Sequence, residues 1–149
     1  MLKSKIIDVL KTFTQEELKS FRNYINSPFH NSNKNVIKLF ELIRKHGPEY
    51  NSPSLQKEKL FRKLYPSKKY SDIVLRILLS DLLKLSEDFL AYQRFVKTPL
   101  AGELYLLEEL KNRKLDSLFA KVIKESEQAL GNEGAINEIY FFNRYSLEN

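Results

Sequence analysis

Cysteine is absent from the sequence, and its absence removes three kinds of chemistry. The protein cannot form disulfide bridges, hold zinc through thiolates or use a cysteine nucleophile. A chain without cysteine suits a reducing compartment, so we expect a cytoplasmic protein.

Glycine is also scarce, with 4 residues in 149. The glycine-rich phosphate-binding motifs GxGxxG and GxxxxGKS/T do not occur, and neither does the GxSxG turn of serine hydrolases. The sequence therefore predicts neither a nucleotide-binding loop nor a serine nucleophile at such a turn.

Only two histidines are present, His30 and His46. They are separated by a predicted helix and form no HxxxH pair, and no carboxylate sits at ligand spacing beside His30. We expect no metal site and no cofactor.

Adjacent carboxylates occur at three places, Glu16-Glu17, Glu87-Asp88 and Glu108-Glu109. Acid–base catalysis needs carboxyls in a pocket that separates their pKa values, and solvated helix faces do not provide one. With no catalytic motif in the sequence, we expect a non-enzymatic protein and assign no catalytic residue.

Long uninterrupted apolar runs are missing as well. Lys5, Asp8 and Lys11 break the N-terminal segment, which therefore lacks the apolar core of a signal peptide. Charges interrupt every later apolar stretch within a few residues, so we expect no membrane partner.

What the sequence does contain is typical of a globular domain, with 42% hydrophobic and 30% charged residues. A chain of 149 residues buries roughly 70% of its unfolded surface on folding, which is enough for a core. The net charge of +6 is unevenly spread: residues 1–70 hold 15 Lys and Arg against 6 Asp and Glu, whereas residues 71–149 hold 10 against 13. The basic half permits an anionic partner without requiring one.

Apolar residues recur every three or four positions through most of the chain, and no run alternates as strands do. The pattern predicts an all-α fold, an irregular multi-helix bundle around one long central helix. Thr14 and Glu17 have the spacing of a capping box. The expected helices span residues 2–13, 15–26, 33–46, 55–65, 72–96, 103–111, 115–130 and 135–147.

The strongest periodicity belongs to the helix expected over residues 72–96. At 1.5 Å per residue this helix would be roughly 35 to 40 Å long. We therefore expect it to be the central helix of a bundle over residues 1–97, in contact with the shorter helices. Its expected apolar stripe comprises Val74, Leu75, Leu78, Leu79, Leu82, Leu85, Phe89 and Tyr92.

From residue 98 the helices follow in pairs that resemble α-solenoid hairpins, although no 34-residue repeat can be aligned. We expect residues 98–149 to form a hairpin-like extension, either separate from the bundle or continuous with it, at the start of a longer helical region.

The last expected helix, over residues 135–147, is rich in aromatic residues. A helix that is apolar all round is normally buried on several sides. We expect either the remainder of a longer chain or a second copy of this chain to cover it. The candidate interface residues are Tyr140, Phe141, Phe142 and Tyr145.

Nucleic-acid binding is the alternative, because residues 33–95 read as helix, loop, helix, turn, helix, with a basic entry into the third helix as in helix-turn-helix proteins. Against it, that helix is too long for a recognition helix, its stripe is too wide to leave a free face, and no wing follows. The candidate nucleic-acid contacts are Lys57, Lys59, Arg62, Lys63, Lys68, Lys69 and Arg76.

The stretch YINSPFHNSN separates the second and third expected helices. Pro28 should end one helix, and Ser32 or Asn33 should cap the next. Phe29 is expected to staple the connector onto the core. We interpret the stretch as a structural joint, with His30 as the one candidate for an exposed partner contact.

Three strings, FTQEELKSFRNYINSPFHNSNK, LQKEKLFRKLYPSKKYSDIVLRILLSDLLKL and EDFLAYQRF, resemble the N-terminal region of a group of large uncharacterised bacterial proteins. In that group similar strings precede a longer helical remainder. The resemblance implies a helical N-terminal domain of a longer bacterial protein and transfers no site.

The sequence as a whole favours a non-enzymatic helical module for protein–protein interaction or scaffolding, with an unknown protein or the rest of a longer chain as its partner. The alternative is a nucleic-acid-binding helical domain that uses the basic region 57–76.

Overall fold

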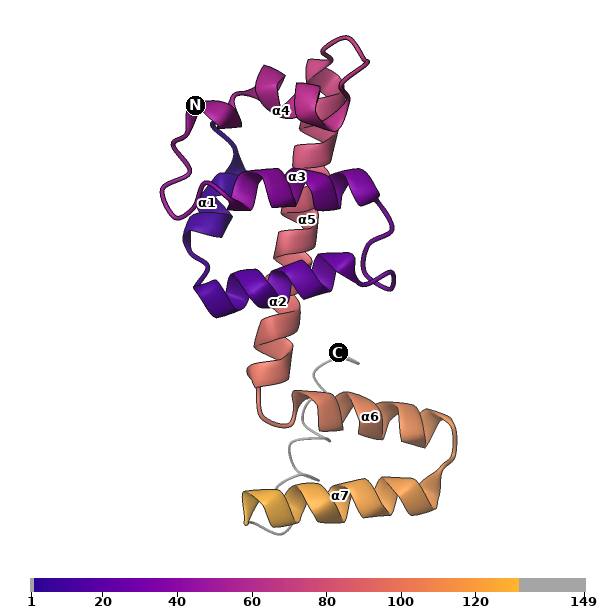
Figure 1. Cartoon of the computed structure of the whole chain (residues 1–149). Coiled ribbons are helices and arrows are strands. Elements are labelled where there is room, and N and C mark those ends of the chain that lie inside the picture. The colour runs from indigo at the N-terminus through magenta and orange to yellow at the C-terminus, as the bar shows by residue number, and fades with distance from the viewer. Residues whose placement is uncertain (1, 132–149) are drawn as a thin grey trace, which may run out of the picture. The chain divides into compact units, whose positions relative to one another are not determined.

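A computed structural model describes residues 2–131 of the chain (Figure 1). Over these residues it contains seven α-helices, one short 3-10 helix and no strand, which confirms the all-α prediction. The helix expected over residues 135–147 lies outside the described residues. The α-helices are α1 (Lys5–Lys11), α2 (Gln15–Asn26), α3 (Lys34–Arg44), α4 (Lys57–Leu64), α5 (Asp72–Lys97), α6 (Ala101–Asn112) and α7 (Asp116–Leu130), and η1 (Pro53–Leu55) is the 3-10 helix.

The chain divides into two compact units at Ala91 and Tyr92. Unit 1, Met1–Ala91, contains α1 to α4 and most of α5. Unit 2, Tyr92–Asn149, contains the end of α5 with α6 and α7. Each unit has its own cluster of buried apolar side chains.

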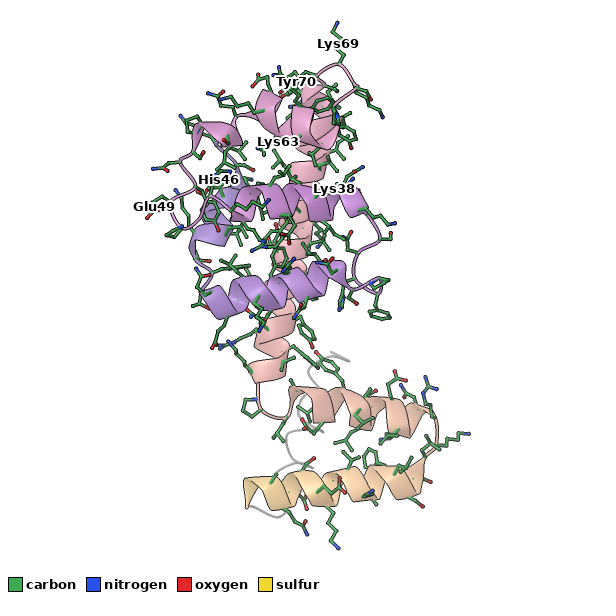
Figure 2. The ribbon with its side chains drawn as sticks, viewed as in Figure 1. Lys38, His46, Glu49, Lys63, Lys69 and Tyr70 are labelled. Atoms are coloured by element: carbon green, nitrogen blue, oxygen red, sulfur yellow. The ribbon has the colours of Figure 1, made fainter. Side chains whose placement is uncertain are left out.

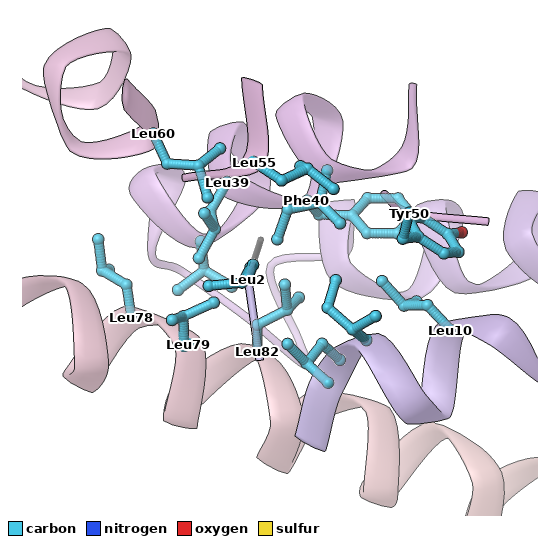
Figure 3. Packing of buried hydrophobic residues seen from close by; sticks show 14 of the residues in the cluster. Leu2, Leu10, Leu39, Phe40, Tyr50, Leu55, Leu60, Leu78, Leu79 and Leu82 are labelled. Atoms are coloured by element: carbon cyan, nitrogen blue, oxygen red, sulfur yellow. The ribbon is translucent and has the colours of Figure 1, made fainter. Parts of the chain in front are cut away.

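The core of unit 1 forms along one face of α5. Leu78, Leu79 and Leu82 of α5 lie among apolar side chains from the other helices, including Leu39 and Leu60 (Figure 3). These α5 residues recur every three or four positions, which is the spacing of one helix face. The long central helix predicted from periodicity is therefore confirmed.

Two residues of the expected apolar stripe of α5 are exposed, and a third, Leu85, is only partly buried. Val74 is 38% exposed because, at 100° per residue, it lies outside the arc that contains Leu75, Leu78, Leu79 and Leu82. Tyr92 is 50% exposed, since it follows Phe89, the last residue of α5 in the unit 1 core. The buried stripe is thus narrower and shorter than predicted.

Four phenylalanine rings meet at the centre of unit 1. The ring of Phe21 in α2 is fully buried, and its centroid lies 5.1 Å from that of Phe40 in α3, 5.2 Å from Phe89 in α5 and 5.6 Å from Phe13. The contacts with Phe13 and Phe40 are edge to face, the favourable geometry for aromatic pairs. One side chain therefore joins three helices.

Local capping fixes where α2 and α3 begin. The Glu17 backbone N–H donates to Thr14 Oγ1 at 3.1 Å, and the Thr14 N–H donates to Glu17 Oε1 at 3.2 Å, so the predicted capping box is confirmed. Asn33 caps α3, since its side-chain oxygen accepts from the Asn35 N–H at 3.0 Å.

The loop after α3 closes one side of the core through Tyr50. This residue is buried, with a backbone φ of 51°, and its ring lies beside Phe40 and Leu10 (Figure 3). A Cβ atom on Gly47 would come within 2.8 Å of the Tyr50 hydroxyl oxygen. The glycine is needed here because the tyrosine ring turns back onto it.

Unit 2 is a helical hairpin as far as it is described. Leu107 of α6 is buried and packs with Leu104 and with Phe119, Val122 and Ile123 of α7. The short turn between the helices includes Lys114 in a left-handed conformation, φ 58°. This pairing agrees with the hairpin expected after residue 98.

We expect Phe21→Ala to lower the free energy of unfolding by about 3–5 kcal/mol, the range for truncating a buried phenylalanine. Urea denaturation followed by circular dichroism at 222 nm measures the effect. Phe29→Ala is the matched control: Phe29 is 91% exposed, so its loss should change the free energy by less than about 0.5 kcal/mol. Equal effects of the two substitutions would contradict the packing described.

Candidate functional site

His46 and Glu49 are neighbours on the loop after α3 (Figure 2). No third histidine or carboxylate joins them, and within residues 2–131 no group of three such side chains could hold a metal ion. None of the described helices is long and apolar enough to cross a bilayer.

The seven cations proposed as nucleic-acid contacts come from three consecutive segments. Four are in α4 (Lys57, Lys59, Arg62 and Lys63), two are in the turn that follows (Lys68 and Lys69), and Arg76 is in the second turn of α5. The structure brings two of them together, because Lys57 Nζ lies 3.2 Å from Asp72 Oδ1 and Arg76 Nε lies 3.0 Å from Asp72 Oδ2. The other five form no ion pair within the described part of the chain.

Asp72, the first residue of α5, is the shared partner of Lys57 and Arg76. The Tyr70 hydroxyl also donates to Asp72 Oδ1, at 3.0 Å. The hydrogen bond from Lys57 and then that from Tyr70 hold the pKa of the Asp72 carboxyl below its usual value. The carboxylate thus fastens α4, the turn and α5 to one another.

Aromatic contacts also hold the turn between α4 and α5. The Tyr70 ring packs edge to face on Phe61 of α4 at 5.4 Å, and Phe61 lies 5.0 Å from Tyr65. Lys68 Nζ sits 5.2 Å from the centre of the Tyr65 ring, within the range of a cation–π interaction. Tyr70 and the lysines before it therefore sit on an ordered turn.

The start of α5 exposes large apolar side chains. Ile73 is 63% exposed and Ile77 is 55% exposed. Tyr70 and Val74, each more than a third exposed, complete a set that we call the α5 stripe: Tyr70, Ile73, Val74 and Ile77.

The α5 stripe follows one side of the helix. Within the helix Ile77 comes three residues after Val74 and four after Ile73, so these side chains are adjacent. Tyr70 stands in the turn just before the helix. At 100° per residue, Ile73 and Ile77 lie on the side opposite the buried Leu75 and Leu82. Scattered apolar residues are ordinary on protein surfaces, but a contiguous group with a polar surround marks an interaction site.

Sequence reasoning missed this feature. It treated the apolar surface of the helix as too broad to leave a free face, whereas the structure shows a free face that is itself apolar. A signal was available, because Ile73 and Ile77 are four residues apart and half a turn away from the leucines of the core.

The connector between α2 and α3 is built by backbone and asparagine hydrogen bonds. The Asn31 side-chain amide donates to the carbonyl oxygens of Ile25 at 3.0 Å and Asn33 at 3.2 Å, and its oxygen accepts from the Asn33 N–H. The His30 ring stacks on Tyr24 at 3.9 Å. The expectation that Phe29 staples the connector to the core is wrong: asparagine closes the joint, and the phenylalanine points into solvent.

The aromatic residues predicted to form a C-terminal interface, Tyr140, Phe141, Phe142 and Tyr145, lie outside the described residues. The α5 stripe and its basic surroundings are therefore the candidate site on the described part of the chain.

We expect the Asp72 carboxyl to titrate below the ordinary aspartate value of about 3.9. Carbon-detected NMR measures the midpoint, and Asp72→Asn identifies the resonance. Lys57→Gln should raise the pKa most and Tyr70→Phe less, following the order of their hydrogen bonds. Because the folded pKa is the lower one, the charged carboxylate stabilises the fold above the unfolded pKa and loses this contribution as the pH falls through the folded pKa. A midpoint that neither variant moves would contradict the arrangement.

Comparison with protein-family models, with curated proteins and with solved structures found no match to this chain. The function must therefore be inferred from the surfaces of the molecule itself.

Proposed function

We propose that the protein is a non-enzymatic protein–protein interaction module whose docking face is the α5 stripe. The observation that carries the proposal is the exposure of Ile73 and Ile77 beside Tyr70 and Val74 on an ordered helix. We further propose a cytoplasmic setting, because the chain has no cysteine.

The apolar area of the α5 stripe sets the free energy available for docking. Burying a large apolar side chain fully contributes about 1.5–3 kcal/mol. The four side chains of the α5 stripe are roughly half exposed, so covering them would contribute about 3–6 kcal/mol before the cost of association. This amount supports a complex without any rearrangement of the core.

Nucleic-acid binding is the second candidate. It is favoured by the five cations of α4 and its following turn that form no ion pair with any residue of 2–131. The first turns of α5 favour a protein instead. A recognition helix directs polar side chains from its N-terminal turns to base edges. Here these turns direct isoleucines outward, and the Arg76 guanidinium is paired with Asp72.

We expect a photoreactive amino acid at position 77 to form a discrete adduct in cells that make the protein, because the docking face covers this position. The adduct should be sensitive to protease and resistant to nuclease. The same residue at Glu87, an exposed position further along α5, should give no adduct, and Ile73→Asp should weaken the adduct at position 77. The absence of an adduct, or equal labelling at both positions, would overturn the proposal.

A fluorescence-anisotropy titration with a random DNA duplex at two salt concentrations tests the second candidate. We expect no saturable binding even at the lower concentration. Affinity that collapses steeply as salt rises would show phosphate contacts with counterion release and would favour nucleic acid. Lys59→Glu and Lys63→Glu should then abolish it.

A further inference from the structure

We propose that the partner surface which docks on the α5 stripe is an acidic amphipathic helix, packed along the first two turns of α5. This inference rests on the proposed function and adds the chemical class of the partner. It follows from three properties of the site: its length, its backbone and its charge.

The length of the site matches a helix partner. Within α5 the stripe runs from Ile73 to Ile77, about 6 Å along the axis at 1.5 Å per residue, and Tyr70 of the preceding turn extends it at the N-terminal end. A second helix presents apolar residues at spacings of three and four along one face, so its row can interdigitate with Ile73, Val74 and Ile77. Tyr70 and Ile77 would mark the two ends of the contact.

The backbone of the site excludes pairing by strand addition. The docking face lies on a helix and not on the edge of a sheet, and the described residues contain no strand with a free edge. A partner therefore has to be recognised through side chains. Helix packing does this with rows of apolar residues, whereas an added strand depends on main-chain hydrogen bonds.

The excess of positive charge around the α5 stripe favours a negatively charged partner. Residues 57–76 contain seven Lys and Arg but only two acidic residues, Glu58 and Asp72. Asp72 is already engaged by Lys57 and Arg76. Lys69 directly precedes Tyr70, and both lie with Lys63 at the α4 end of unit 1 (Figure 2). Carboxylates flanking the apolar row of a partner would meet these lysines.

The same charge disfavours a second copy of the chain as the occupant. Two stripes brought face to face would bring together the five cations of each copy that do not pair with Asp72. Like charges across an interface oppose association. An acidic helix gains attraction and apolar burial together, so it is the occupant that the site favours.

Selection from a displayed library of single-helix peptides tests the inference. The library is enriched on the wild-type protein and depleted on the Ile73→Asp/Ile77→Asp variant, whose exposed changes should leave its circular dichroism unchanged. We expect the retained peptides to be net acidic, with apolar residues at i, i+3 or i+4, and i+7. Retained peptides that are neutral or basic would overturn the acidic partner and leave the docking face intact. If no peptide depends on the stripe, the helical partner is refuted, and the adduct at position 77 separately decides the proposed function.

Charge reversal on the protein provides a second measurement with one retained peptide, labelled with fluorescein. Lys63→Glu and Lys69→Glu should each weaken its binding by about two- to fivefold, as expected for exposed charge pairs. Lys19→Glu, on the exposed side of α2, is the matched control and should have no effect. Phosphatidylserine vesicles and a random DNA duplex serve as competitors, and tighter stripe-dependent binding of either than of the peptide would overturn the inference.

Discussion

The buried face of α5 is the constraint on which unit 1 depends. The helices α1 to α4 have 7, 12, 11 and 8 residues, and isolated helices shorter than about 12–15 residues are marginal in water. They persist because their apolar faces pack against α5 and one another, with Phe21 at the centre. The stability of unit 1 therefore comes from one shared core rather than from independent helices.

A helix that supports the core on one face has another face left over. In most of α5 that outer face is polar, as at Ser80 and Lys84, which forms an ion pair with Asp88. Large apolar side chains are exposed in its first turns and again near its end, at Tyr92 and Val96. At the first turns Asp72 and Phe61 hold the approach to the helix in place. The α5 stripe thus begins at a turn that is held by several contacts, which lowers the entropy lost when a partner binds.

Local signals were the most predictable part of the structure. Thr14, Glu17 and Asn33 act on backbone groups within three residues, so their roles follow from spacing alone. Exposure was less predictable, because it depends on distant segments. Phe29 is a large apolar residue in the connector between α2 and α3 and was expected to pack on the core. The Asn31 side chain closes that connector instead. Ile77 was not singled out at all, since periodicity identifies apolar positions without saying which of them a neighbour covers.

The location of the stripe within the charge distribution connects fold and function. Apolar burial supplies affinity but little selectivity, because any apolar surface can cover isoleucine. Charges at the rim add little affinity, yet they repel partners of the wrong sign and speed the approach of the right one. Unit 1 places both at the α4–α5 turn, where Asp72 pairs with two cations, and the lysines around Tyr70 form no ion pair among the described residues. The same turn that aligns α5 for folding therefore determines which partners its outer face can accept.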